Sequence, residues 1–153
     1  MRKEYVDAFS VIAYVDYVKP IGSGHINETY SVTLRGFNNP SYILQKINQS
    51  VFPNIEQLCN NIQRVTKHLE EFGGDQYQIM HLIKAQDGKL WHQASDGNFW
   101  RLFNFIPDSY SFDLAPSNRF AKEAGKAYAW FIKTLSTLDQ PPLFEIIPKF
   151  HNI

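Results

Sequence analysis

The residues with the clearest chemical potential lie in a short glycine-rich turn, Gly22-Ser23-Gly24-His25-Ile26-Asn27, between two strand-like segments. Glycine lets the backbone approach phosphate oxygens closely and direct its N–H groups at them. Taken alone, a G-x-G hairpin is more often only a tight turn. It is not a dinucleotide-binding fingerprint, because a strand follows it and no third glycine arrives at the required spacing. The turn predicts a phosphate-binding loop only together with other features.

A lysine follows one strand later. Lys46 lies near the end of the apolar segment 43–47. Side chains alternate between the two faces of a strand, so Lys46 shares a face with Leu44 and lies opposite Gln45. The simplest interpretation is an edge lysine that extends toward water. Its position after the glycine turn favours another one, in which the ammonium group contacts the phosphates of a bound nucleotide.

The third feature is the segment Arg101-Leu102-Phe103-Asn104-Phe105-Ile106-Pro107-Asp108, a strand that breaks at its proline. An apolar slot with free backbone donors and acceptors suits a flat adenine ring, but for this segment taken alone a buried strand end is the better explanation. Glycine loop, strand lysine, helix and strand-to-helix hinge follow the order found in the small lobe of protein-kinase-like enzymes. The joint occurrence favours a nucleotide-binding lobe.

Four sequence blocks also carry a family resemblance: GSGHINETY at 22–30, YILQKIN at 42–48, NIQRVTKHL at 61–69 and RLFNFI at 101–106. They resemble the aminoglycoside phosphotransferase/choline kinase superfamily, and within it the N-acetylhexosamine 1-kinase branch. The likeness runs from about Lys19 to the C-terminus. It includes Glu123-Ala124-Gly125 and the segment 147–152.

The resemblance implies an ATP-dependent kinase with Mg²⁺ that phosphorylates a small hydroxylated substrate, such as the anomeric hydroxyl of an amino sugar. It implies that the nucleotide contacts Gly22, Ser23, Gly24, His25 and Asn27 in the loop, Lys46 in the strand, and Phe103, Asn104 and Ile106 in an adenine-binding hinge.

Two features depart from the family pattern. These kinases pair the strand lysine with a helix glutamate, but the apolar stripe of residues 55–72 holds no carboxylate. Asn61 at its flank, or Glu56 from the first turn, remains as a partner for Lys46. The H-x-D-x-x-x-x-N loop and the downstream Asp motif, which supply the base and the Mg²⁺ ligands, are absent from the sequence. We therefore expect this chain alone to be inactive, with catalytic residues and Mg²⁺ ligands in a C-terminal lobe outside it.

The elements that would position these residues predict an α+β fold like a protein-kinase small lobe, with a mostly antiparallel sheet of five or so strands, one packed helix, a hinge and a further helix. Residues 1–106 are expected to form the nucleotide-binding lobe and residues 107–153 the hinge and the first helix toward the second lobe. Strand character occurs at 14–19, 29–34, 42–47, 78–83, 89–93 and 98–106, and helices are expected at 4–12, from Asn54 to Gly73, and from Pro116 to Leu138.

The composition limits the partners. Fifteen basic and fifteen acidic side chains cancel to a formal charge of zero, which argues against nucleic acid as a ligand. No apolar stretch has the length of a bilayer span, and the N-terminus lacks the apolar run of a signal peptide, so we expect a soluble cytoplasmic protein without a membrane partner. The single cysteine, Cys59, excludes an internal disulfide and is expected in the core. The five histidines lack metal-ligand spacing and are expected in surface or loop positions.

Two other interpretations remain. The chain could be a non-catalytic module that binds a nucleotide or a protein and self-associates. A lobe separated from its mate should expose apolar surface along the second helix, and a homodimer or an exchanged helix would bury it. The other is an unrelated α+β protein whose glycine loop is accidental.

Overall fold

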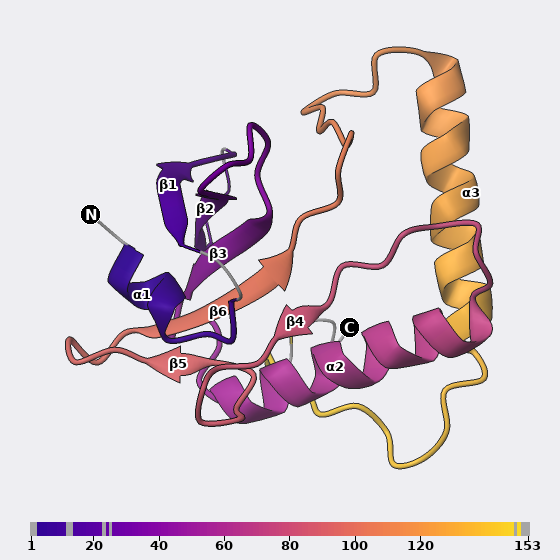
Figure 1. Ribbon diagram of the computed structural model, residues 1–153. Helices are drawn as coiled ribbons and strands as arrows, with labels where there is room; N and C mark the ends of the chain where they lie inside the picture. Colours follow the sequence, from indigo (N-terminus) through magenta and orange to yellow (C-terminus); the bar gives the residue numbers. More distant parts are fainter. Residues whose placement is uncertain (1–2, 12–13, 23, 25, 149, 151–153) are drawn as a thin grey trace.

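A computed structural model of the chain describes residues 3–11, 14–22, 24, 26–148 and 150. The fold is α+β, with an antiparallel six-stranded sheet and three helices among these residues (Figure 1). In chain order the elements are α1 (Lys3–Asp7), β1 (Val15–Pro20), β2 (Glu28–Leu34), β3 (Tyr42–Ile47), α2 (Ile55–Phe72), β4 (Leu82–Ile83), β5 (His92–Gln93), β6 (Phe99–Asn104) and α3 (Asn118–Leu135).

The sheet has the strand order β1-β2-β3-β6-β4, and β5 also pairs with β6. Every pair is antiparallel, as the sequence predicts. The strands β1, β2 and β3 form the expected meander, and α2 connects β3 to β4. The strands β4 and β5 have only two residues each, much shorter than predicted. The turns around Gly88 and Gly97, both with positive φ, occupy most of that region.

One face of the sheet, which we call the α1 face, packs against the N-terminal segment. Helix α1 ends at Asp7, earlier than the predicted 4–12, because the chain beyond it pairs with residues 84–86: the Ser10 N–H donates to the Lys84 carbonyl at 2.9 Å. The buried cluster on this face includes Val6, Phe9, Tyr30, Val32, Leu44, Trp100 and Leu102.

The opposite face, which we call the α2 face, packs against α2. Its buried cluster includes Ile47 and Phe103 from the sheet and Ile55, Leu58 and Cys59 from the helix. The two clusters follow from the period of two along each strand: Leu44 lies on one face, and Ile43 and Ile47 on the other.

Helix α2 has the predicted ends. The side chain of Asn54 accepts a hydrogen bond from the Gln57 N–H at 3.0 Å, which satisfies one free donor of the first turn. Gly73 donates to the Leu69 carbonyl at the other end, and the left-handed residue is Gly74, with φ +68°. A side chain at Gly73 is excluded, because a Cβ would lie 2.4 Å from the ring of Trp130.

Two residues near the end of α2 differ from the predicted burial. Phe72 is 60% exposed, although the periodicity places it on the buried side. His68, expected in a surface or loop position, is buried instead and contacts the end of α3, with its Nε2 3.0 Å from both the Thr134 carbonyl and the Thr137 hydroxyl. The burial is explained by this contact between helices, which local periodicity does not report.

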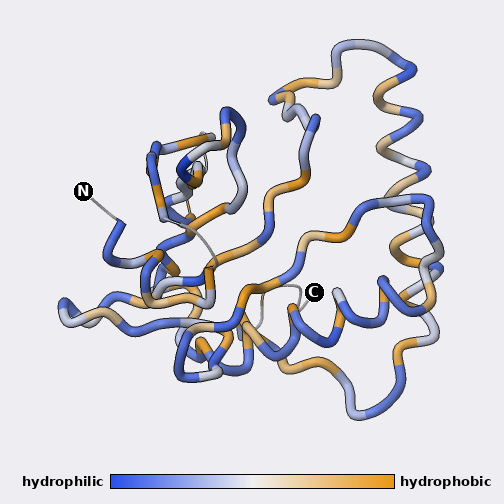
Figure 2. The backbone as a smooth tube through the Cα atoms, in the orientation of Figure 1, coloured by the Kyte–Doolittle hydropathy of each residue, from blue (hydrophilic) through white to orange (hydrophobic). Residues whose placement is uncertain are grey.

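Helix α3 stands away from the sheet and meets α2 near one end (Figure 1). The Trp130 indole donates to the Gly73 carbonyl at 2.9 Å across that contact. Apolar residues recur along α3 (Figure 2), yet none of its residues is buried. Phe120, Tyr128 and Ile132 are 49%, 67% and 53% exposed.

The chain after α3 returns along α2 in an extended form, as the paired prolines predict. The Arg64 guanidinium donates to the carbonyls of Asp139, Pro141 and Pro142 at 3.0, 2.6 and 3.4 Å. A search of the described ranges finds no helix that is both long and apolar enough to cross a bilayer.

Candidate functional site

The glycine turn connects β1 to β2 at the end of the sheet. The Ile21 N–H donates to the Thr29 carbonyl at 2.9 Å and closes the base of the turn. Gly22 has φ +77°, a backbone conformation that favours glycine. A Cβ at Gly24 would meet only an ordinary contact at 3.8 Å, so sterics do not require glycine there. Ser23 and His25, also predicted to contact phosphate, lie outside the described residues.

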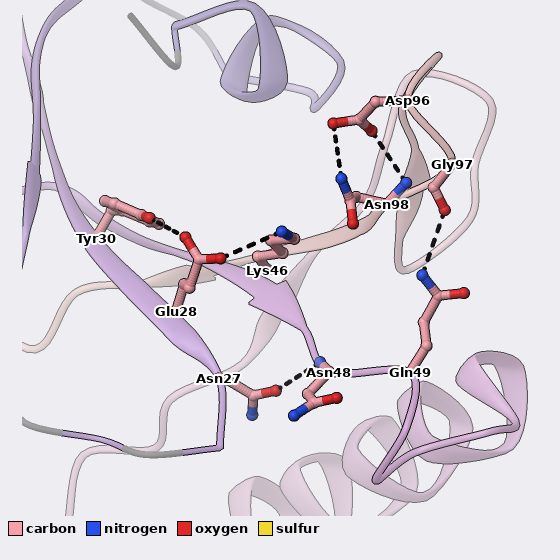
Figure 3. A network of polar contacts seen from close by, with 9 residues as sticks. All are labelled: Asn27, Glu28, Tyr30, Lys46, Asn48, Gln49, Asp96, Gly97 and Asn98. Carbon is pink, nitrogen blue, oxygen red and sulfur yellow. Dashed lines mark hydrogen bonds and ion pairs between the residues drawn. The ribbon is translucent and has the colours of Figure 1, made fainter.

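Asn27 anchors the turn to the neighbouring strand. Its Oδ1 accepts a hydrogen bond from the Asn48 N–H at 3.0 Å, just after the end of β3 (Figure 3). The predicted contact of Asn27 with a nucleotide stays a prediction. In this structure the side-chain oxygen holds the loop and the end of β3 together.

Lys46 pairs with Glu28, which lies directly opposite it in the β2–β3 ladder. The Lys46 Nζ is 3.2 Å from Glu28 Oε1, and the Tyr30 hydroxyl donates to the other carboxylate oxygen (Figure 3). The prediction of Asn61 or Glu56 as the partner is therefore wrong. Opposite charges at facing positions of an antiparallel pair attract, so a register worked out from the β2–β3 turn would have indicated Glu28.

The face on which Lys46 lies explains why no α2 residue reaches it. Lys46 is opposite Trp100 in the ladder, and Trp100 belongs to the buried cluster of the α1 face. Helix α2 covers the other side of the sheet, where Gln45 points. A lysine–helix ion pair of the kinase type therefore cannot form from Lys46 in this arrangement.

An open pocket of about 300 Å³ surrounds Lys46 at this end of the sheet. Its lining residues are Ile26, Glu28, Lys46, Ile47, Asn48, Gln49, Ser50 and Asn98. Hydrogen bonds from Asn98 hold the pKa of Asp96 below its usual value, and the nearby Lys46 ammonium acts in the same direction. The ammonium group thus already has acidic neighbours, which weakens its attraction for an incoming phosphate.

Asn61 and Glu56 have other surroundings. The Asn61 side chain makes two hydrogen bonds with the backbone of Phe144, at 2.8 Å as donor and 3.0 Å as acceptor, and so holds the chain after α3. Glu56 is exposed and lines a separate open pocket of about 280 Å³, together with Lys84, Lys89 and Trp91 among others.

In the predicted hinge, two residues have mainly structural contacts. Phe103 is 4% exposed and packs in the cluster of the α2 face. Asn104 joins β6 to the segment before β4, because its Oδ1 accepts from the His81 N–H at 2.6 Å and its own N–H donates to the His81 carbonyl.

Ile106 retains a free backbone donor. Its carbonyl accepts from the Ser109 hydroxyl at 2.6 Å, whereas its N–H donates to no acceptor within the described part of the chain. A half-buried N–H beside apolar side chains is the kind of group that an adenine nitrogen accepts from. Of the three predicted hinge residues, Ile106 keeps a main-chain group available to a ligand.

Arg101 is a buried polar residue of the sheet that was not among the predicted nucleotide contacts. Its residue is 7% exposed, its Nε donates to Gln45 Oε1 at 3.0 Å, and its guanidinium lies 5.2 Å from the centre of the Phe103 ring. Burial lowers the pKa of the Arg101 guanidinium and raises the pKa of the Cys59 thiol to about 11. The thiol is therefore neutral near pH 7 and does not balance the arginine.

No group of three or more His, Cys, Asp or Glu side chains capable of holding a metal ion occurs among the residues that the structure describes.

A scan against protein-family models finds none that matches this chain, so the family resemblance of the four sequence blocks stays a prediction.

Proposed function

We propose that this chain forms the N-terminal ATP-binding lobe of a small-molecule kinase, which transfers the γ-phosphate of ATP to a hydroxyl group of a sugar or amino sugar. The acceptor contacts and the catalytic base belong to a C-terminal lobe outside these 153 residues. By this proposal the chain binds the nucleotide but does not catalyse transfer alone.

The observation that carries the proposal is the arrangement of the β1–β2 hairpin relative to the rest of the sheet. A turn containing Gly22 and Gly24 lies at the end of a continuous antiparallel sheet, next to the end of β3. Helix α2 then packs on one face, and β6 leads into irregular chain before α3. The order of glycine turn, packed helix and strand end supports the proposal, because a nucleotide-binding lobe has its phosphate loop, helix and hinge in this order.

Within this proposal, each part of the chain has a separate task. The backbone of the glycine turn offers N–H groups to phosphate oxygens at a point where glycine allows close approach. The Ile106 N–H donates to the adenine base. Bound Mg²⁺ would neutralise charge on the phosphates, with its protein ligands in the second lobe.

The test is calorimetry of ATP·Mg²⁺ binding to the chain and to two variants at Ile106. The Ile106→Pro variant removes the N–H, which has no acceptor in the described structure, whereas Ile106→Ala keeps it. We expect Ile106→Pro to weaken binding by about tenfold or more, and Ile106→Ala to have a smaller effect. Binding that is the same for the two variants would remove the hinge from the proposal, and absence of binding to the unmodified chain would contradict the proposal itself.

A second candidate function is a non-catalytic module that self-associates, and the exposed aromatic surface of α3 favours it. Phe120, Tyr128 and Ile132 lie on a helix with no buried residue. Such a surface is commonly covered by association. Light scattering should then give the mass of a dimer, and Tyr128→Lys should shift it toward that of a monomer. A monomer at working concentrations would contradict this second function.

A further inference from the structure

We propose that Arg101, on the α2 face of the sheet, binds a phosphate group of the nucleotide, and that Lys46 does not. The inference rests on the proposed nucleotide-binding function and assigns to it a residue that lies in one of the resembling blocks but was not among the predicted nucleotide contacts.

The first observation is that the guanidinium group is buried with donors to spare. Its Nε donates to the Gln45 side chain. Nη1 is enclosed without an acceptor, and no acceptor for Nη2 occurs in the described part of the chain. The Nη edge of the planar guanidinium therefore carries donors that no described residue satisfies. This geometry suits the oxygens of a phosphate.

The second observation is the missing counter-charge. A buried cation is costly unless an anion pairs with it. The ion pairs of the described residues involve other cations, and none includes Arg101. The neighbouring titratable group is the Cys59 thiol, which is neutral at pH 7. A buried arginine without a carboxylate beside it is a group that an anion from outside the chain would stabilise.

The third observation is the row of polar side chains that leads to Arg101. The Gln45 side chain donates to the Thr29 hydroxyl at 3.1 Å and accepts from Arg101 at 3.0 Å. Thr29 is in β2, shortly after the glycine turn, and Arg101 is in β6, shortly before the hinge. The row crosses three strands on the face that carries α2 and links the two ends of the proposed nucleotide site. A nucleotide on this face would bring its phosphates toward the arginine.

Lys46 provides a matched control. It follows Gln45, the partner of Arg101, in β3, but it lies on the α1 face and is paired with Glu28. A general electrostatic attraction for phosphate should respond to the loss of either cation. A specific site on the α2 face should respond to Arg101 alone.

The experiment measures by calorimetry the affinities of the unmodified chain and of three variants for ATP and for adenosine. The variants are Arg101→Gln, Arg101→Lys and Lys46→Ala. We expect the unmodified chain to prefer ATP over adenosine by about tenfold or more, because charged hydrogen bonds are strong. Arg101→Gln should reduce that preference to about one, Arg101→Lys should leave an intermediate value, and Lys46→Ala should leave it unchanged. Circular dichroism of each variant verifies that it folds.

A second measurement keeps the test decisive if Arg101→Gln folds poorly. Thermal unfolding is followed with sodium tripolyphosphate and with sodium chloride at the same ionic strength. Tripolyphosphate should raise the melting temperature of the unmodified chain and of Lys46→Ala, and have a smaller effect on Arg101→Lys. Equal effects of the two salts on the unmodified chain would overturn the inference.

The outcomes separate this inference from the proposed function. Equal binding of ATP and adenosine, or a preference that depends on Lys46, overturns the role of Arg101 and leaves the nucleoside site intact. An Arg101-dependent effect of tripolyphosphate without adenosine binding supports the anion site and contradicts the kinase lobe. If the unmodified chain binds neither nucleotide nor tripolyphosphate, both proposals are contradicted.

Discussion

The cations on the two faces of the sheet differ in exposure and in ion pairing. On the α1 face, Lys46 is partly exposed and pairs with Glu28 across the β2–β3 ladder. On the α2 face, Arg101 is buried and its charge has no partner among the described residues. An exposed ion pair costs little to form and stabilises little, whereas a buried unpaired charge is expensive. The charge of Lys46 is thus balanced within the chain, whereas by the proposal above an anionic ligand would balance that of Arg101.

The largest changes in stability are expected from the buried apolar side chains next to each cation, and they test whether the two faces have separate cores. Trp100→Ala on the α1 face and Phe103→Ala on the α2 face should each lower the free energy of unfolding by about 3–5 kcal/mol, because both side chains are almost fully buried. Urea denaturation measures this loss. The exposed Phe37→Ala variant is the control, and a loss of similar size there would contradict the assignment of the two cores.

Replacing the buried cation should stabilise the protein in the absence of ligand. Arg101→Met keeps a long side chain beside Phe103 and removes the unpaired charge, so we expect a gain of about 1 kcal/mol or more in the free energy of unfolding. Gln45→Met should instead cost about 1–3 kcal/mol, because it takes away the acceptor of the Arg101 Nε. A loss of stability in Arg101→Met would mean that the charge is already compensated.

Alkaline pH should expose the effect of burial on the α2 face. The pKa of Cys59 is about 11 in the folded chain and near its ordinary value of 9.0 when unfolded. The folded state therefore binds more protons between about pH 9 and 11, so its stability should fall by up to about 1.4 kcal/mol per pH unit in that range and level off above it. The difference between unmodified protein and Cys59→Ala isolates this effect, and parallel curves for the two proteins would contradict it.

The smallest effect belongs to the exposed pair. Glu28→Gln should lower the free energy of unfolding by no more than about 1 kcal/mol, and high salt should reduce the difference further. Thermal unfolding at two salt concentrations measures it. A loss as large as that of a core variant would show that the Lys46–Glu28 pair has a structural role comparable to the buried residues.

Much of the fold could be predicted because it depends on local chemistry. The Asn54 cap and the glycines after α2 are encoded within a few residues of each helix end. The alternation along β3 assigns Lys46 and Gln45 to opposite faces from the sequence alone. The helix on one face was predicted as well, but its side relative to Lys46 was not, since that depends on how the chain packs after β3.

The candidate site was harder to predict because its contacts are distant in sequence. Gln45 and Arg101 are 56 positions apart and meet only through the β3–β6 register. Asn61 resembled a partner for the lysine, but its contact with Phe144 lies 83 positions away. The strands β4 and β5 lie within the predicted segments 78–83 and 89–93, but their length was not predicted, because only two residues of each pair with β6.

The attachment of residues 139–144 to α2 has a mechanical consequence. The side chains of Arg64 and Asn61 hold this stretch by its backbone carbonyls and amide, with little dependence on which side chains it carries. A displacement of α2 would therefore move this stretch with it as one rigid unit. Ile146, just beyond this stretch, packs against the cluster of the α2 face, so the chain after α3 and the sheet are coupled through α2.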